Sequence, residues 1–199
     1  FTLGFRNAFS YKNLSMSVLV DMKFGADVYS MSKMQSHVNG TSKETLEGRE
    51  GWYASEQARL SANVDAKDWT PTGGYVGKGV KAVTDADGNV SYVPNDVYVD
   101  PAKYWQALQN SSPEPFICDN SFVKLREVSL SYSCPKKWFV HTPIESVTLS
   151  AYGRNLLLIY SKVDNIDPES SYNNGNGQGF EYGSLPSRRT FGFGINVKF

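Results

Sequence analysis

Residues 190–199, which read Thr190-Phe-Gly-Phe-Gly-Ile-Asn-Val-Lys-Phe199, decide the fold. Hydrophobic residues occupy every second position of this stretch, and small or polar residues fill the positions between them. Such strict alternation predicts a β-strand with one apolar and one polar face. The apolar face continues to Phe199, whereas the ends of soluble domains usually fray into polar tails. The pattern is typical of the closing strand of an outer-membrane β-barrel, although an inner strand of a soluble sandwich would alternate in the same way.

Four further stretches alternate similarly. Residues 1–11 and 14–24 predict a long hairpin with a two-residue turn, and further strands are predicted at 122–133 and 146–158. Strands of about 9–11 residues have the length needed to cross a membrane, while strands in soluble proteins average about 5–6 residues. Residues 156–160 could extend the fourth of these strands into the aqueous phase.

The strand at 122–133 has one irregular half. Simple alternation places Lys124 and Arg126 on the same face as Val128, which interrupts the apolar face of this strand. The sequence offers no explanation for two cations on a face that otherwise contacts lipid.

Residues 25–120 break the alternation and are rich in polar residues and proline. Short helices are predicted at 31–35 and 42–60, and a third begins at Pro101, which follows Asp100 as a proline at the first helical position. Residues 81–93 predict a small hairpin that turns at Asp87-Gly88. A connection of this length is either functional or disordered, and its many Trp and Tyr residues favour a folded, functional unit.

The composition excludes several classes of protein. The chain of 199 residues has a formal net charge of zero and no basic cluster, which argues against nucleic-acid binding. No run of 18 apolar residues is present, and the mean hydropathy is −0.40, so a helical membrane protein is excluded. Cys118 and Cys134 flank a predicted strand that would hold them about 50 Å apart, too far for a disulfide.

The lengths of the connections agree with a barrel. If Phe199 lies at the periplasmic end, the connections at 12–13 and 134–145 are periplasmic and short. Those at 25–120 and 161–187 are then extracellular and long, as in outer-membrane barrels. Five strands cannot close a barrel, because the smallest membrane barrels have about 8. We therefore expect this chain to be the C-terminal part of a longer protein, with the first residue already inside a strand.

Several segments resemble the C-terminal part of the SusC/RagA family of TonB-dependent outer-membrane transporters of Bacteroidetes. They span nearly the whole chain in the order of the family, and they are Asn7–Ser17, Lys23–Ser30, Gly48-Arg-Glu-Gly-Trp-Tyr53, Phe122–Tyr132 followed by Pro135, Gly153-Arg-Asn-Leu156, Asp167-Pro-Glu169 and Gly183-Ser-Leu-Pro-Ser-Arg188. Cys134 departs from the pattern, since an apolar residue is expected before the proline.

The resemblance implies an all-β antiparallel transmembrane β-barrel segment, part of a plugged barrel of about 22 strands. It implies residence in the outer membrane and TonB-driven import of glycans (oligosaccharides) or peptides, with a SusD-like lipoprotein as partner. The plug and the segment that contacts TonB would lie before residue 1. It also implies that Phe199, at the end of the closing strand 190–199, acts as a signal for barrel assembly.

The candidate ligand-binding residues are the aromatic residues of the long loop and one arginine, namely Trp52, Trp69, Tyr75, Tyr98, Tyr104, Trp105 and Arg154. The aromatic rings could stack on sugars, or they could pack the core of the loop or against the lid protein. Arg154 could line the transport path, or it could pair with a carboxylate of the barrel or plug.

No catalytic set, metal site or cofactor site is predicted. His37 and His141 fall on opposite sides of the membrane in this topology, and no nucleophile–base pair accompanies either of them. The prediction is therefore a transport protein and not an enzyme. The alternatives are a soluble secreted β-sandwich that binds carbohydrate through the same aromatic residues, and a barrel enzyme whose nucleophile lies upstream.

Overall fold

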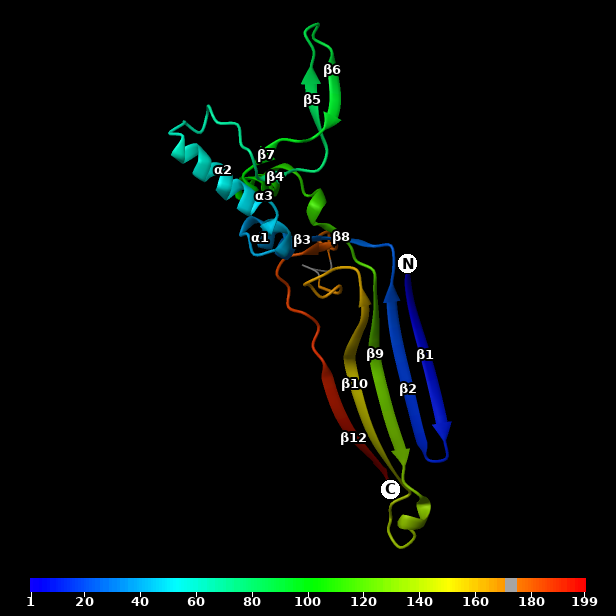
Figure 1. The fold of residues 1–199 in the computed structure, drawn as a ribbon. Coiled ribbons are helices and arrows are strands. Elements are labelled where there is room, and N and C mark those ends of the chain that lie inside the picture. Colours follow the sequence, from blue (N-terminus) through cyan, green and yellow to red (C-terminus); the bar gives the residue numbers. More distant parts are fainter. Residues whose placement is uncertain (171–174) are drawn as a thin grey trace. The chain divides into compact units, whose positions relative to one another are not determined.

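The structure is a computed structural model that describes residues 1–170 and 175–199. The chain divides into two compact units (Figure 1). The first comprises Phe1–Ser30 and Ile117–Phe199, and the second comprises Met31–Phe116.

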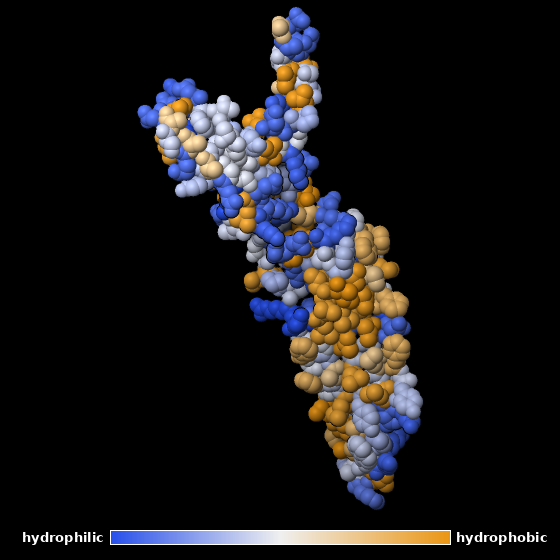
Figure 2. All heavy atoms as spheres, in the orientation of Figure 1, coloured by the Kyte–Doolittle hydropathy of each residue, from blue (hydrophilic) through white to orange (hydrophobic). Residues whose placement is uncertain are grey.

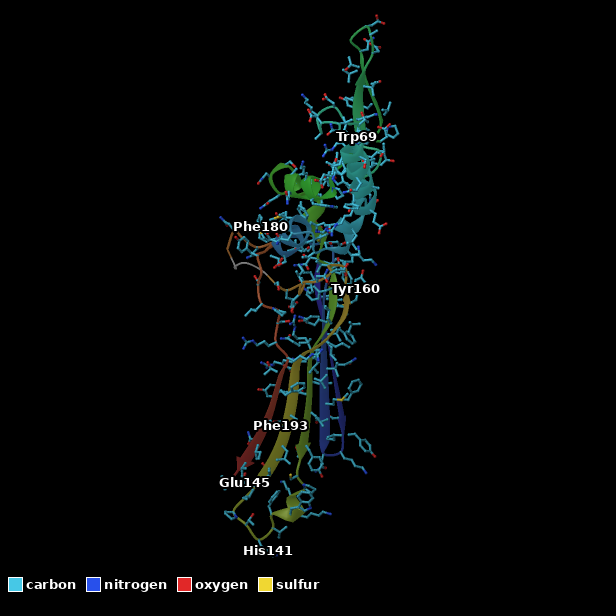
Figure 3. All side chains as sticks on the ribbon, turned by 60° about the vertical axis from the view of Figure 1, so that its left-hand side comes forward. Trp69, His141, Glu145, Tyr160, Phe180 and Phe193 are labelled. Carbon is cyan, nitrogen blue, oxygen red and sulfur yellow. The ribbon has the colours of Figure 1, made fainter. Side chains whose placement is uncertain are left out.

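A five-stranded antiparallel sheet forms most of the first unit, with the strand order β1-β2-β9-β10-β12 (Figure 1). Its strands are β1 (Thr2–Tyr11), β2 (Leu14–Lys23), β9 (Phe122–Ser133), β10 (Ser146–Ser161) and β12 (Thr190–Lys198). All five strand predictions are confirmed, including the extension of the fourth strand beyond residue 155. The connection between β9 and β10 holds a short 3-10 helix, Lys136–Trp138, and carries His141 and Glu145 (Figure 3).

The register keeps like residues in rows across the sheet. One row on the apolar face consists of Phe9, Met16, Leu130, Ala151 and Phe193. The neighbouring row on the polar face consists of Ser10, Ser15, Ser131, Ser150 and Gly194. Because a shift of one residue would reverse the faces of a strand, the alternation in the sequence fixes this register.

A β-bulge interrupts the register at Arg126. Leu19 of β2 lies opposite Glu127. The next residue, Val20, lies opposite Leu125, so that Arg126 has no opposite residue in β2. The pairing of β9 with β10 shifts at the same level, between Arg154 and Leu157. One extra residue in a strand reverses the parity of the residues beyond it.

The bulge corrects the expected faces of two cations. Lys124 lies opposite Asp21, a residue of the polar face, and Arg126 bonds to the same carboxylate. The prediction that these cations share the face of Val128 is therefore wrong. Val123 and Leu125 take the apolar positions instead, opposite Met22 and Val20, so the apolar face stays continuous.

The apolar face of the sheet is exposed. Phe193 is 87% exposed and Ile195 is 72% exposed, and the same holds for large side chains on the other strands (Figures 2 and 3). A soluble sandwich would bury such a face against a second sheet about 10 Å away. No helix among the described residues has both the length and the apolar character needed to cross a membrane.

Three short strands complete the regular structure of the first unit. They form a small sheet in the order β11-β3-β8, and they are β3 (Asp27–Ser30), β8 (Ile117–Asp119) and β11 (Phe180–Glu181). Cys118 lies in β8 and Cys134 follows β9. No disulfide joins these two cysteines in the part of the chain that the structure describes, as the strand between them predicts.

The second unit contains the predicted helices. They are α1 (Met31–Val38), the 3-10 helix Lys43–Leu46, α2 (Arg49–Ser61), α3 (Pro101–Ser111) and the 3-10 helix Glu114–Phe116. The Asp100 carboxylate caps α3 by accepting a hydrogen bond from the backbone N–H of Ala102 at 2.9 Å, as predicted for this start signal. Two strand pairs accompany the helices: β4 (Tyr75–Val76) with β7 (Tyr98–Val99), and the predicted hairpin of β5 (Val80–Thr84) and β6 (Val90–Pro94).

Glycines allow the start of α2 to touch a neighbouring loop. Gly48 has a φ of +79°, and a Cβ atom on it would lie 2.5 Å from the carbonyl carbon of Gly74. A Cβ atom on Gly73 would lie 2.7 Å from the carbonyl oxygen of Gly51. Backbone therefore packs directly on backbone here, which explains both glycines of the Gly48-Arg-Glu-Gly51 motif.

Candidate functional site

A buried lysine organises the upper, polar side of the sheet. Lys124 is 3% exposed, and its Nζ donates to Glu169 Oε2 at 2.5 Å and to Ser187 Oγ at 2.7 Å. The same atom lies 3.3 Å from Asp167 Oδ1. A buried cation requires such partners, because an unpaired charge away from water is costly.

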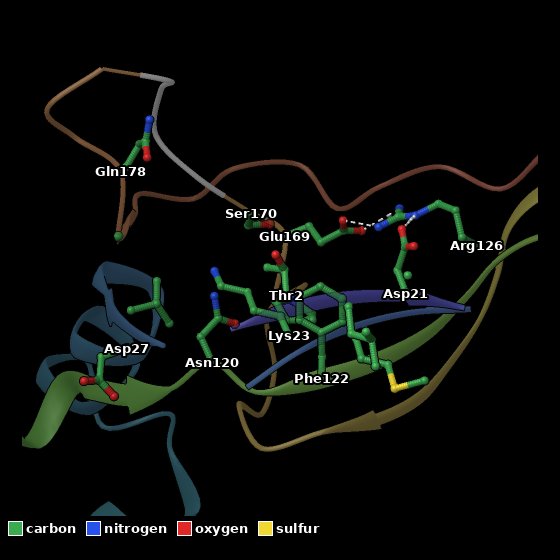
Figure 4. Close-up of a pocket in the computed structure, with 16 residues that line it drawn as sticks. Thr2, Asp21, Lys23, Asp27, Asn120, Phe122, Arg126, Glu169, Ser170 and Gln178 are labelled. Atoms are coloured by element: carbon green, nitrogen blue, oxygen red, sulfur yellow. Dashed lines mark hydrogen bonds and ion pairs between the residues drawn. The ribbon is translucent and has the colours of Figure 1, made fainter. Parts of the chain in front are cut away.

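Arg126, the bulge residue, makes a second set of ionic contacts beside Lys124. Its Nε donates to Asp21 Oδ2 at 2.5 Å, and its Nη1 donates to Asn155 Oδ1 at 2.6 Å. Both carboxylate oxygens of Glu169 accept from this guanidinium (Figure 4). We call Asp21, Lys124, Arg126, Asp167 and Glu169 the ionic cluster.

The ionic cluster fixes two loop segments to the sheet. Asp167 accepts hydrogen bonds from the backbone N–H of Glu169 at 3.0 Å and of Ser187 at 2.8 Å. Asn155, which has a φ of 52°, donates to the carbonyl oxygen of Arg188 at 3.0 Å. The segments that carry the family resemblance around residues 122–132, 153–156, 167–169 and 183–188 therefore meet at one place.

The carboxylates of the cluster remain charged. Burial raises the pKa of Glu169, but hydrogen bonds from Arg126 and Lys124 outweigh this effect, and the net pKa is lowered. For Asp167, burial likewise opposes hydrogen bonds from Ser187 and from two backbone N–H groups, and the net pKa is again lowered. The cluster therefore acts as a set of fixed charges that hold the loop, with no group poised to exchange a proton near neutral pH.

A hollow of about 650 Å³ lies next to the ionic cluster (Figure 4). Arg126 and Glu169 form part of its wall, and the ends of β1 and β2 and the segments that follow β2 and precede β9 form the rest. Polar residues of the wall include Thr2, Lys23, Asp27, Asn120 and Gln178. We refer to this space as the hollow.

Asp119 positions the segment that enters β9. Its Oδ1 accepts from the backbone N–H of Ser121 at 2.9 Å, and its Oδ2 accepts from Lys162 Nζ at 2.7 Å. The bond from Lys162, followed by that from the Ser121 hydroxyl, lowers the pKa of Asp119 to about 2.

This shift predicts an acid-dependent loss of stability. Because the pKa of Asp119 falls from 3.8 to about 2 on folding, its contribution is present above pH 3.8 and disappears as the pH falls toward 2. We expect Asp119→Asn to lower the thermal unfolding temperature at pH 5 and to narrow its difference from the unmodified protein at pH 2. A constant difference over this pH range, measured by calorimetry, would contradict the assignment.

Three of the predicted ligand-binding aromatics lie in the core of the second unit. The ring centroids of Tyr75 and Tyr104 are 4.6 Å apart, and those of Tyr104 and Trp105 are 5.3 Å apart. Trp105 also packs against the buried His37, with the centroids 4.6 Å apart. These contacts favour the packing role for Tyr75 and Tyr104, since both rings are occupied by neighbours.

The other predicted aromatics occupy different surroundings. Trp52 and Trp105 both line a second hollow of about 400 Å³, and the Nε1 of Trp105 is buried without a hydrogen-bond partner among the described residues. Trp69 donates from Nε1 to Ser55 Oγ at 3.1 Å, whereas the side chain of Tyr98 is exposed. A role of any of these residues in ligand binding stays a prediction.

Arg154 lies on the polar face and has a carboxylate partner. Its Nε donates to Glu127 Oε2 at 2.8 Å, and its guanidinium carbon lies 5.3 Å from the centroid of the Tyr152 ring. The side chain is 60% exposed, so the pair leaves the cation accessible. Phe199 is exposed after the last residue of β12.

The ionic cluster and the hollow were not among the predicted site residues. Their members stand far apart in the sequence, and the bulge hides the true face of Lys124 and Arg126. The usable signal was the presence of two cations in β9 and of the acidic Asp167-Pro-Glu169, since a barrel wall places charges inside only with partners. Residues 1–170 and 175–199 contain no group of three or more His, Cys, Asp or Glu side chains that could hold a metal ion.

Comparison with known proteins supports the resemblance. No protein-family model matches the chain. TonB-dependent receptor P3 of Formosa agariphila is 27% identical over 205 residues, which cover 100% of the chain, and receptor P26 of the same organism is 28% identical over 201 residues, which cover 98%. The resemblance to SusC/RagA-type TonB-dependent receptors is confirmed. The receptor-like chain spans only 16% of the length of each of these relatives.

Solved structures show the same fold. A structure of the RagAB peptide importer in the closed-closed state covers 100% of the receptor-like chain with a TM-score of 0.60 at 17% identity. A structure of the RagAB peptide transporter covers 98% with a TM-score of 0.54 at 18% identity. In both cases the match is to 17% of the longer chain.

Proposed function

We propose that the chain forms part of the wall of an outer-membrane, TonB-dependent importer of oligosaccharides or peptides. The exposed apolar face of the five-stranded sheet is the observation that carries this proposal. A β-sheet that faces lipid needs apolar residues on one side only, with small and polar residues toward the lumen. The serine-rich rows of the opposite face, in which Ser17 Oγ lies 2.8 Å from Ser129 Oγ, suit such a lumen.

The topology follows from the connections. The turn at 12–13 and the connection at 134–145 face the periplasm, and the stretches 25–120 and 161–187 are extracellular loops. The helices of the second unit then belong to a folded loop outside the membrane, where they contact ligand and lid. The ionic cluster anchors the second extracellular loop to the inside of the wall.

The rest of the machine lies outside this chain. Within the described residues, β1 and β12 each pair on one side only, so both edges of the sheet are free to continue into a plugged barrel of about 22 strands. The solved relative is a two-component peptide importer by its name, RagAB. We infer a SusD-like lipoprotein as the second component and TonB as the source of energy. In this role the chain performs no covalent chemistry.

Deletion of Phe199 tests its role in assembly. We expect the deletion to reduce the amount of folded barrel in the outer membrane, because the closing strand loses its last apolar residue and the proposed assembly signal. The heat-modifiable band on a gel measures the folded amount. A matched Lys198→Ser variant should assemble normally, and an unchanged folded amount after loss of Phe199 would refute the role.

Import is tested directly by uptake. Cells that carry or lack the gene would be given radiolabelled trialanine or maltotriose, with and without an uncoupler of the inner membrane. Uptake that requires both the gene and an energised inner membrane supports the proposal. A protein found only in the soluble fraction, which binds sugars without detergent, would instead support the secreted carbohydrate-binding module.

A further inference from the structure

The Asn120 side chain borders the hollow with its hydrogen-bonding capacity unused. The residue is 4% exposed, and its Oδ1 is buried without a hydrogen-bond partner among the described residues. Its backbone N–H is satisfied by the carbonyl oxygen of Ala26 at 2.6 Å, so the backbone is held while the carboxamide projects toward the hollow (Figure 4). A buried polar group normally has a partner, so an unpartnered one in the wall of a hollow indicates a missing ligand.

Two opposite charges also line the hollow without ion-pair partners in the described part of the chain. Lys23 ends β2 and Asp27 begins β3, and neither side chain takes part in a hydrogen bond or salt bridge there. The other charged residues of the wall differ, because Asp21, Arg126 and Glu169 neutralise one another in the ionic cluster. The hollow therefore offers one available cation and one available anion.

We infer that the hollow binds a short peptide with free termini. A carboxamide has the same donor and acceptor as a peptide group, so Asn120 can pair with the backbone of an extended peptide through two hydrogen bonds. Asp27 would receive the terminal ammonium, and Lys23 would receive the terminal carboxylate. This inference rests on the proposed import function and narrows its substrate to peptides at this site.

Neutral oligosaccharides fit the hollow less well. A sugar hydroxyl could bond to Asn120, but it would leave Lys23 and Asp27 without counter-charges. A simple anion would satisfy Lys23 and be repelled by Asp27. Only a ligand with both charges and a backbone amide uses all three groups.

The test compares binding of defined probes to the intact native polypeptide purified in detergent. The probes are trialanine, its N-acetylated and C-amidated form, and maltotriose, each titrated by calorimetry. We expect trialanine to bind at least about 10-fold more tightly than the blocked form, because each lost ion-pair costs at least about 1.4 kcal/mol in a partly buried site. Maltotriose should not displace it.

Variants assign the three groups. Asp27→Asn should abolish the preference for a free amino terminus, and Lys23→Gln should abolish the preference for a free carboxylate. Asn120→Leu should weaken the free and blocked peptides alike, and Asn120→Asp serves if the leucine variant does not fold. Lys12→Gln and Asp85→Asn remove a cation and an anion that do not line the hollow, and they should leave binding unchanged.

The outcomes separate this inference from the import function. Absence of trialanine binding, equal affinity for free and blocked peptides, or an unaltered preference in the Lys23 and Asp27 variants would overturn the peptide site. Energy-dependent maltotriose uptake together with any of these results would leave the import function standing. Loss of outer-membrane location would remove the import function, while peptide binding could persist.

Discussion

Replacement of Lys124 with alanine should lower the free energy of unfolding by about 3–5 kcal/mol, because it removes one partner of a buried ion pair. The side chain of Lys124 is 4% exposed and that of Asp167 is 10% exposed. Without the ammonium, Asp167 keeps its backbone donors but loses its cation, and Ser187 loses a hydrogen-bond donor. We expect the second extracellular loop to detach from the sheet as a consequence.

The measurement is the temperature at which the folded barrel converts to the unfolded form on a gel, together with protease cleavage of residues 162–189. Lys162→Ala is the matched control, because the pair of Lys162 with Asp119 is half exposed and such pairs contribute about 0–1 kcal/mol. Equal effects of the two substitutions would show that the ionic cluster does not hold the loop.

The second large effect is expected at Gly48. Gly48→Ala should destabilise the second unit by about 2–5 kcal/mol, as the sum of left-handed backbone strain and steric overlap. The new methyl group would lie 2.5 Å from backbone atoms of Gly74 and Tyr75, and no flexible side chain can move to relieve this overlap. The N-terminal turn of α2 would then separate from the loop that it contacts.

Gly88→Ala separates the two causes. Gly88 also has a positive φ, +85°, but a methyl group there would meet no atom within 4 Å. It should therefore show only the backbone cost, about 1–2 kcal/mol. Native-state proteolysis of residues 31–116 reports the fraction of open molecules for both variants. A Gly48→Ala effect no larger than that of Gly88→Ala would disprove the close backbone packing.

Much of the sheet could be predicted because its physics is local. Alternation with a period of two identifies each strand and its faces, as the rows of Phe9 and Ser10 show. Helix α3 was similarly predictable from Asp100 and Pro101, whose capping roles depend only on neighbouring residues.

The bulge at Arg126 could not be predicted in this way. A single extra residue reverses the faces of Phe122 and Lys124, and alternation cannot show where such a reversal occurs. The ionic cluster depends on this reversal and on contacts between residues 43 to 105 positions apart. The hollow also remained hidden, because its wall combines segments from both ends of the chain.

The aromatic residues show a related difficulty. Composition identifies Tyr75, Tyr104 and Trp105 as functional or structural, and only their mutual packing in the second unit favours the structural role. Trp52 could not be distinguished from them by sequence, although it borders a hollow. Which role a ring plays depends on what fills its faces in three dimensions.

The central claim is that the sheet crosses the outer membrane with the second unit outside. The most direct test inserts an epitope tag between Asp87 and Gly88 in one variant of the intact polypeptide, and between His141 and Thr142 in another. We expect antibody to bind the first tag on intact cells and the second only after the outer membrane is permeabilised. Labelling of both tags on intact cells, or of neither tag in an outer-membrane fraction, would contradict the account.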